Sequence, residues 1–100
     1  MNIIVLGAGA IGSLYGAKLS EFNNVTLVAK KKHADKINKD GLKVIGLEGS
    51  VYKIKAATKI NKIEKDTLVV LTTKVQDSEK AIKGIKNLIR NDTTILCLQN

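Results

Sequence analysis

Short apolar runs rich in β-branched residues recur along the chain, and segments of helical character separate them. Four of these runs predict strands buried on both faces, at residues 2–6, 25–29, 67–73 and 93–98. Helices are predicted between them, at residues 10–22, at residues 33–40 and from a cap at Asp77 or Ser78 onward. Strands that alternate with helices predict a parallel sheet joined by right-handed crossovers.

The pattern changes over residues 42–57. Residues 42–45 predict a strand, residues 48–50 are typical of a turn, and residues 51–56 alternate apolar side chains with lysines. Such alternation predicts an antiparallel strand with one solvent-exposed face. We therefore expect an α/β fold, with a Rossmann-like, doubly wound, mostly parallel sheet and a small antiparallel excursion around residues 42–57.

A glycine pattern lies between the first predicted strand and the first predicted helix. Gly7, Gly9 and Gly12 form G-x-G-x-x-G, and a second predicted strand follows the helix. Gly7 allows a tight turn, Gly9 lets the backbone approach a pyrophosphate, and Gly12 lets the helix pack closely on the sheet. The free N–H groups at the helix N-terminus favour an anion there. In this context the pattern indicates a dinucleotide-binding site.

Lysine dominates the charge of the chain. Seventeen basic and nine acidic residues give a net charge of +8, and Arg90 is the only arginine. Half of the excess, +4 from six lysines and two aspartates, lies within residues 30–43. The chain has only three aromatic residues, so it lacks the stacking and forked side chains common in nucleic-acid binders. We therefore expect no nucleic-acid partner.

The end of the second predicted strand distinguishes two cofactors. NAD sites usually carry Asp or Glu there, about 20 residues after the glycines, to bind the ribose 2′-hydroxyl. Here Lys30, Lys31 and Lys32 follow the strand, and no acid is present. Lys30 is the best candidate to contact the 2′-phosphate of NADP, whereas the other two fit equally well as solvated helix residues. We expect His33 to be exposed near the start of that helix.

Two more polar residues follow predicted strands, at the sheet edge where α/β proteins bind ligands. Lys74 follows residues 67–73, and Asn100 follows residues 93–98. Cys97, within the last strand, is expected to be a buried small side chain. A single cysteine and a single histidine exclude an internal disulfide and a Cys- or His-rich metal site, so we expect no metal ion.

Membrane and export signals are not predicted. No run approaches the roughly 18 apolar residues of a transmembrane helix. The apolar N-terminal stretch lacks a basic region before it and leads directly into glycines, unlike a secretory signal. We expect no membrane partner and a cytoplasmic location.

Taken together, these segments resemble the N-terminal domain of the ketopantoate reductase (2-dehydropantoate 2-reductase) family. The resemblance covers all 100 residues and rests on residues 7–16, 25–33, 40–42, 73–74 and 98–100. It implies NADPH-dependent reduction of 2-dehydropantoate to pantoate, a step toward pantothenate and coenzyme A.

The resemblance also implies roles for individual residues. The cofactor pyrophosphate would be bound by the loop of Gly7, Ala8, Gly9, Ala10, Ile11 and Gly12. Lys30 stands where the family commonly has an arginine that contacts the 2′-phosphate, and lysine keeps the charge without the planar fork. Lys74 would lie near the nicotinamide and its ribose. Asn100, from the family's Gln-Asn-Gly motif, would lie between nicotinamide and substrate and contact both.

In this family the general-acid lysine and the main substrate-binding residues come from a helical C-terminal domain. We therefore expect residues 1–100 to be a dinucleotide-binding domain, a fragment that binds cofactor and carries no catalytic residue of its own. The expected partners of the whole enzyme are NADPH and a small 2-keto acid. Formation of a homodimer by the full-length protein is an open alternative.

Two other functions stay open at this point. A sibling NADP-dependent reductase that acts on another keto substrate would share this N-terminal domain. A nucleotide-sensing regulatory module would share the glycine loop, although such modules commonly end the second strand with an acid. Residues beyond position 100 would discriminate between an enzyme and a regulatory module.

Overall fold

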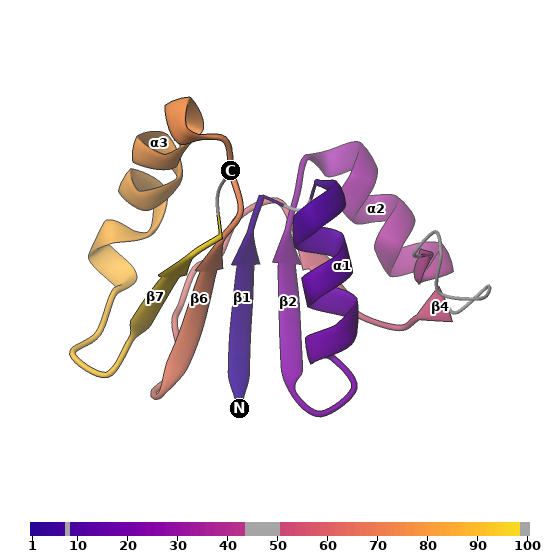
Figure 1. The fold of residues 1–100 in the computed structure, drawn as a ribbon, viewed down its shortest axis with the longest axis horizontal. Coiled ribbons are helices and arrows are strands. Elements are labelled where there is room, and N and C mark those ends of the chain that lie inside the picture. The colour runs from indigo at the N-terminus through magenta and orange to yellow at the C-terminus, as the bar shows by residue number, and fades with distance from the viewer. Residues whose placement is uncertain (8, 44–50, 99–100) are drawn as a thin grey trace.

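A five-stranded parallel sheet forms the centre of the molecule (Figure 1). The computed structural model describes residues 1–7, 9–43 and 51–98. The strands lie in the order β5-β2-β1-β6-β7, and every neighbouring pair is parallel. Their bounds are β1 Asn2–Leu6, β2 Asn24–Val28, β5 Lys55–Ala57, β6 Thr67–Leu71 and β7 Thr94–Cys97. The predicted α/β fold is confirmed.

Helices connect these strands. Within the described ranges they are α1 (Ala10–Leu19), α2 (Lys31–Asp40) and α3 (Val75–Ile85), which continues into a 3₁₀ turn at Lys86–Leu88. A two-stranded antiparallel sheet, β3 (Leu42–Lys43) with β4 (Val51–Tyr52), lies beside α2. None of the helices in the described part of the chain is long and apolar enough to cross a membrane.

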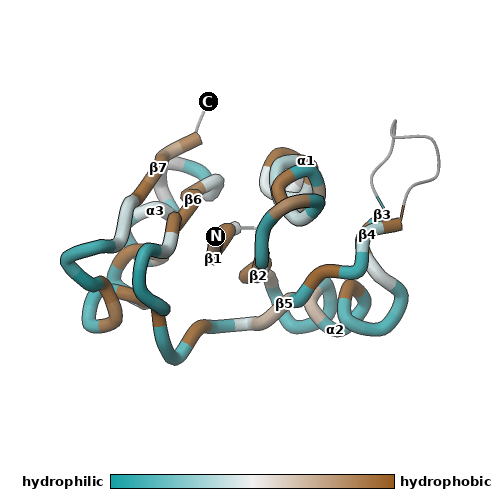
Figure 2. Tube along the Cα trace, turned by 90° about the horizontal axis from the view of Figure 1, so that it is seen from below, coloured by the Kyte–Doolittle hydropathy of each residue, from teal (hydrophilic) through white to brown (hydrophobic). Residues whose placement is uncertain are grey.

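The helices cover both faces of the sheet (Figure 2). On one face, Val5 and Leu27 of the sheet pack with Ala17 of α1 and Ile37 of α2. On the other face, Ile85 of α3 joins a second buried cluster that includes Ile4, Leu6, Val69 and Ile63. Adjacent strand residues point to opposite faces, so β1 contributes to both clusters.

The winding of the chain reverses at β1. The first crossover leads from β1 to β2 on one side, whereas β6 lies on the other side of β1. Leu6, the last residue of β1, is paired with both Val28 of β2 and Leu71 of β6. In α/β proteins such a reversal leaves a crevice at the carboxyl ends of the strands, where ligands bind.

The antiparallel strand predicted at residues 51–56 is two strands with different partners. Only Val51–Tyr52 is antiparallel, paired with β3, whereas Lys55–Ala57 joins the main sheet parallel to β2. The alternation itself is present, because Ile54 and Ala56 are buried while Lys55 is exposed. A period of two reports which side chains are buried and does not report the direction of the partner strand. The turn predicted at residues 48–50 lies outside the described residues.

The helix boundaries differ from the predictions. α1 ends at Leu19 and not at residue 22, and α2 begins at Lys31, within the lysine cluster, and not at residue 33. Lys74 is the N-cap of α3, so the prediction of a cap at Asp77 or Ser78 is wrong. Ser78 Oγ instead donates a hydrogen bond to the carbonyl oxygen of Lys74 at 3.1 Å.

β7 lies at an edge of the sheet, and its side chains are exposed. Ile95 is 38% exposed, Leu96 is 45% exposed, and Cys97 is also exposed. The predictions of a buried strand here and of a buried Cys97 are therefore wrong for this structure. An apolar strand is buried only where another layer covers it, and among the described elements β7 packs mainly against β6.

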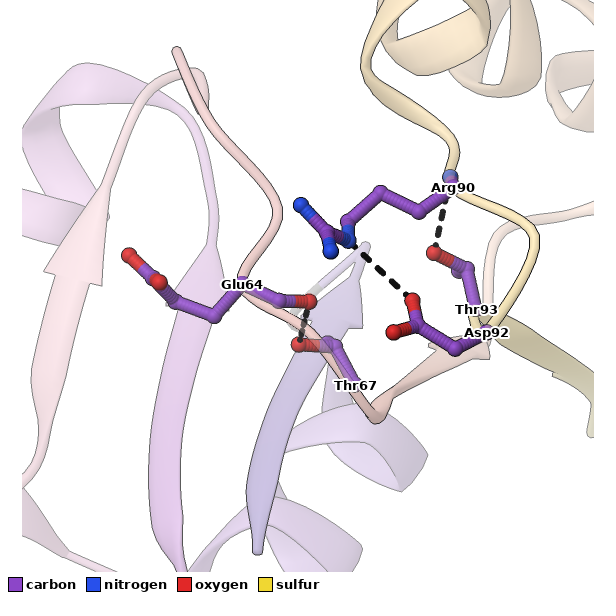
Figure 3. A network of polar contacts seen from close by, with 5 residues as sticks. All are labelled: Glu64, Thr67, Arg90, Asp92 and Thr93. Carbon is purple, nitrogen blue, oxygen red and sulfur yellow. Dashed lines mark hydrogen bonds and ion pairs between the residues drawn. The ribbon is translucent and has the colours of Figure 1, made fainter.

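Polar contacts lie within each of the two turns at the amino ends of β6 and β7 (Figure 3). Thr67 Oγ1 donates to the carbonyl oxygen of Glu64 at 2.7 Å. Arg90 Nε donates to Asp92 Oδ1 at 3.1 Å, and the Arg90 backbone N–H donates to Thr93 Oγ1 at 3.0 Å. Each of these three hydrogen bonds links groups two or three positions apart, so each turn is closed by its own residues.

Candidate dinucleotide-binding site

A groove with a volume of about 1290 Å³ lies at the carboxyl ends of the strands. Figure 1 shows the N-termini of the helices gathered at this edge of the sheet. The groove is lined by the ends of β1, β2 and β6 and by residues from α2, α3 and the segment after β5. Its polar and glycine lining residues include Gly7, Gly9, Gly12, Lys30, His33, Lys59, Thr72 and Lys74.

Gly7 makes the turn out of β1. Its φ of +87° lies in the left-handed region, which favours glycine. A Cβ at Gly7 would lie 2.6 Å from Thr73 Cγ2 and 3.1 Å from the Thr73 backbone nitrogen. The Gly7 N–H donates to the Val28 carbonyl at 3.2 Å, and the Gly9 N–H donates back to the Gly7 carbonyl at 2.8 Å. Conformation and space both require glycine here, as predicted.

Gly12 brings α1 against the end of β1. A Cβ at Gly12 would lie 2.6 Å from the Gly7 carbonyl oxygen and 2.6 Å from Thr72 Oγ1. The Thr72 hydroxyl is placed to donate a hydrogen bond to the carbonyl oxygens of Leu6, at 2.9 Å, and Gly7, at 2.6 Å. The predicted close packing of helix on sheet is confirmed, and Thr72 is the side chain that fixes the turn beneath it.

Gly9 leaves the start of α1 open. A Cβ at Gly9 would meet nothing within 4 Å. α1 has no side-chain cap and no acidic residue in its first turn. Its first N–H groups have no carbonyl partner within the helix, so the N-terminus is suited to an anion. A pyrophosphate fits this open glycine turn. Ala8 lies outside the described residues, whereas Ile11 also lines the groove.

Lys30 and Lys74 flank the glycine turn on its two sides. Lys30 is the N-cap of α2 after β2, and Lys74 is the N-cap of α3 after β6. Both have φ −63° and ψ 151°, both are exposed, and both line the groove. Because β2 and β6 are the two neighbours of β1, the structure brings together the glycine loop and two of the lysines predicted from sequence.

Lys31 and His33 lie near Lys30 and differ in their surroundings. Lys31 Nζ binds Asp35 Oδ2 at 2.7 Å, and this hydrogen bond and charge raise the pKa of Lys31. The ammonium group of Lys31 is therefore paired with Asp35 on the surface of α2. His33 is exposed, as predicted, and also lines the groove. Among the described residues, the ion pairs of lysine involve positions 31, 62 and 83, and neither Lys30 nor Lys74 takes part.

Sequence reasoning missed part of this site. Thr72 and Thr73 were included in a buried strand, but β6 ends at Leu71 and both threonines line the groove. Two hydroxyl side chains after a run of apolar residues were the available signal. Lys59, which follows β5 and also lines the groove, belongs to no motif that the sequence analysis uses. Asn100 lies outside the described residues, so its predicted place between cofactor and substrate stays a prediction.

The comparison with protein families agrees with this geometry. Residues 3–100 match the family described as ketopantoate reductase PanE/ApbA. The chain belongs to this family. A 2-dehydropantoate 2-reductase of Pyrococcus horikoshii is 43% identical over the whole chain, and one of Pyrococcus abyssi is 37% identical. The chain spans about a third of the length of these relatives, 33% in both cases.

Solved structures give the same assignment. A probable 2-dehydropantoate 2-reductase of Bacillus subtilis superimposes on all of this chain, and on 34% of its own, with a TM-score of 0.88 at 29% identity. D-mandelate dehydrogenase in complex with NADH covers all of this chain and 31% of its own, with a TM-score of 0.83 at 32% identity. The family is one of NAD(P)-dependent oxidoreductases, and the Rossmann-like fold predicted from sequence is confirmed.

Proposed function

We propose that this chain is the NADPH-binding domain of a 2-dehydropantoate 2-reductase. The loop from Gly7 to Gly12 holds the pyrophosphate at the start of α1. Lys30 contacts the 2′-phosphate, and Lys74 lies beside the nicotinamide ribose. Bound NADPH supplies the hydride for reduction of a 2-keto group. The protein's own residues here bind and orient the cofactor, and the general acid comes from a part of the enzyme outside residues 1–100.

The residue that follows β2 is the observation that supports a preference for NADP over NAD. An acidic side chain at this position would accept a hydrogen bond from a ribose 2′-hydroxyl and would repel a 2′-phosphate. The chain has Lys30 here, exposed to the groove and outside the ion pairs of the described residues. An unpaired ammonium favours a phosphate over a hydroxyl, because only the phosphate carries a compensating charge.

A titration tests the proposal. NADPH and NADH are titrated into the protein by calorimetry at moderate ionic strength. We expect the affinity for NADPH to exceed the affinity for NADH by at least about tenfold. The Lys30→Gln substitution should remove most of this preference. Lys31→Gln, which removes the same charge from a residue bound to Asp35, is the matched control and should leave the preference unchanged. Equal binding of both cofactors by the unaltered protein would refute the NADP assignment.

A second candidate function is an NADH-dependent reductase for another 2-keto acid. It is favoured by the likeness to D-mandelate dehydrogenase, a neighbour whose structure contains NADH. The same titration separates the two, because this candidate requires NADH to bind at least as tightly as NADPH. Turnover assays with 2-dehydropantoate and with aromatic 2-keto acids, made on the enzyme that carries this domain, then identify the substrate.

A further inference from the structure

A second lysine lies beside Lys30 at the same end of the sheet. β2 and β5 are parallel neighbours, with Val28 paired to Ala57, and the Ala29 N–H donates to the Ala57 carbonyl at 2.9 Å. Lys30 and Lys59 each follow this last pair by two residues. Neighbouring strands are about 4.8 Å apart, so the two lysines follow adjacent strands at the same edge of the sheet. Both are exposed and both line the groove.

Among the described residues, this side of the groove has lysines and no carboxylate. Lys30, His33 and Lys59 line it, and Asp77 of α3, beyond β6, is the acidic residue found among the described lining residues. The nearest acid along α2, Asp35, is bound to Lys31. Lys59 also borders a smaller hollow of about 450 Å³, but Glu64 in that hollow is bound to Lys62 at 3.7 Å. The structure therefore provides Lys59 with no ion pair among the described residues.

Two ammonium groups that approach each other repel, and an anion bound between them would offset that repulsion. The 2′-phosphate of NADP is an anion of the right kind at the end of β2. Lysine binds a phosphate through one ammonium, whereas arginine offers a planar fork of several donors. A second lysine can therefore supply the contacts that a single lysine at position 30 lacks.

We propose that Lys59 is a specificity-determining residue that binds the 2′-phosphate together with Lys30. This inference rests on the proposed NADPH-binding function and adds to it a second element, the segment after β5. The adenosine end of the cofactor would then be held between α2 and that segment. The preference for NADPH would depend on two lysines from neighbouring strands.

The test compares variants by their dissociation constants for NADPH and NADH, measured by titration calorimetry. Lys59→Gln should weaken NADPH binding about tenfold and leave NADH binding within about twofold. Lys59→Arg should retain the preference. Lys55→Gln is the matched control, since Lys55 is an exposed lysine at the opposite end of β5 that borders only the smaller hollow. It should change neither constant, and circular dichroism of all variants checks the fold.

The outcomes separate the inference from the proposed function. If the unaltered protein prefers NADPH but Lys59→Gln keeps the full preference, the inference is wrong and the proposed function stands. An equal loss for NADPH and NADH would place Lys59 at a part common to both cofactors, which also overturns the inference. If the unaltered protein shows no preference for NADPH, both are wrong. Adenosine 2′,5′-bisphosphate and AMP, used as competitors, should show the same selectivity as the two dinucleotides.

Discussion

The two ends of the central sheet are completed in different ways. At the amino ends of β6 and β7, side chains bind backbone groups and each other within a few residues, as in the contacts of Thr67 and Arg90 (Figure 3). At the carboxyl ends, Thr72 and the glycines shape a turn, while Lys30 and Lys74 face the groove. In the described residues the contacts named at the first end lie within the chain, whereas the second end presents lysines and helix N–H groups that suit a ligand.

The largest expected effect comes from the glycine that fits α1 against the carboxyl end. Gly12→Ala places a methyl group 2.6 Å from the Gly7 carbonyl oxygen, and the backbone of the turn cannot move away without opening. We expect a loss of about 2 kcal/mol in the free energy of unfolding, together with weaker dinucleotide binding. Urea denaturation measures the first and titration with NADPH measures the second.

Gly84→Ala is the matched control for that variant. Gly84 is also a helical glycine, but a Cβ there would meet nothing within 4 Å. The alanine should be neutral or should stabilise the protein by about 0.5–1 kcal/mol, because glycine is a poor helix former. If both alanine substitutions changed the free energy of unfolding equally, close packing at Gly12 would not be the cause of the loss.

A smaller change separates binding from folding at the same end. Gly9→Val adds a side chain where the structure has open space, and the backbone at Gly9 has φ −81° and ψ −158°, which valine can adopt. Since the new side chain would occupy the space assigned to the pyrophosphate, we expect NADPH affinity to fall at least about a hundredfold with little change in Tm. Retained NADPH binding would mean that the pyrophosphate lies elsewhere.

The smallest effect is expected at the amino end. Burial alone would raise the pKa of Asp92, but hydrogen bonds from the Arg90 side chain and from backbone groups of Asp66 and Asp92 lower it overall. A lowered native pKa means that the ionised carboxylate stabilises the fold above the ordinary value of 3.8. This stabilisation is lost as the pH falls through the native pKa.

Asp92→Asn should therefore lower Tm slightly at pH 7, by about 2 °C or less, because the contact is near the surface. The difference from the unaltered protein should shrink as the pH falls below 3.8. Thermal unfolding followed by circular dichroism at several pH values measures both. NADPH affinity at pH 7 should not change, and a change would show that the two ends of the sheet are coupled.

Much of the fold was predictable because local signals and tertiary contacts agree. The apolar runs around Val5, Leu27 and Val69 became the strands of a sheet covered on both faces, and the glycine pattern required the turn that the structure shows at Gly7. The exposed β7 and Cys97 were not predictable in this way. Hydropathy states that a strand is suited to burial, but only the arrangement of neighbouring elements decides whether another layer covers it.

Local sequence was sufficient to predict the glycine loop, the absence of an acid after β2 and the positions of Lys30 and Lys74 after strands. These features depend on residue type and on position relative to a strand, which are local properties. Only the tertiary structure placed β6 beside β1, and with it Thr72 against the turn, since the two are distant in sequence. The same holds for β5, whose parallel pairing with β2 brings Lys59 and Lys30 to the same edge of the sheet, because strand order is set by packing across the whole sheet.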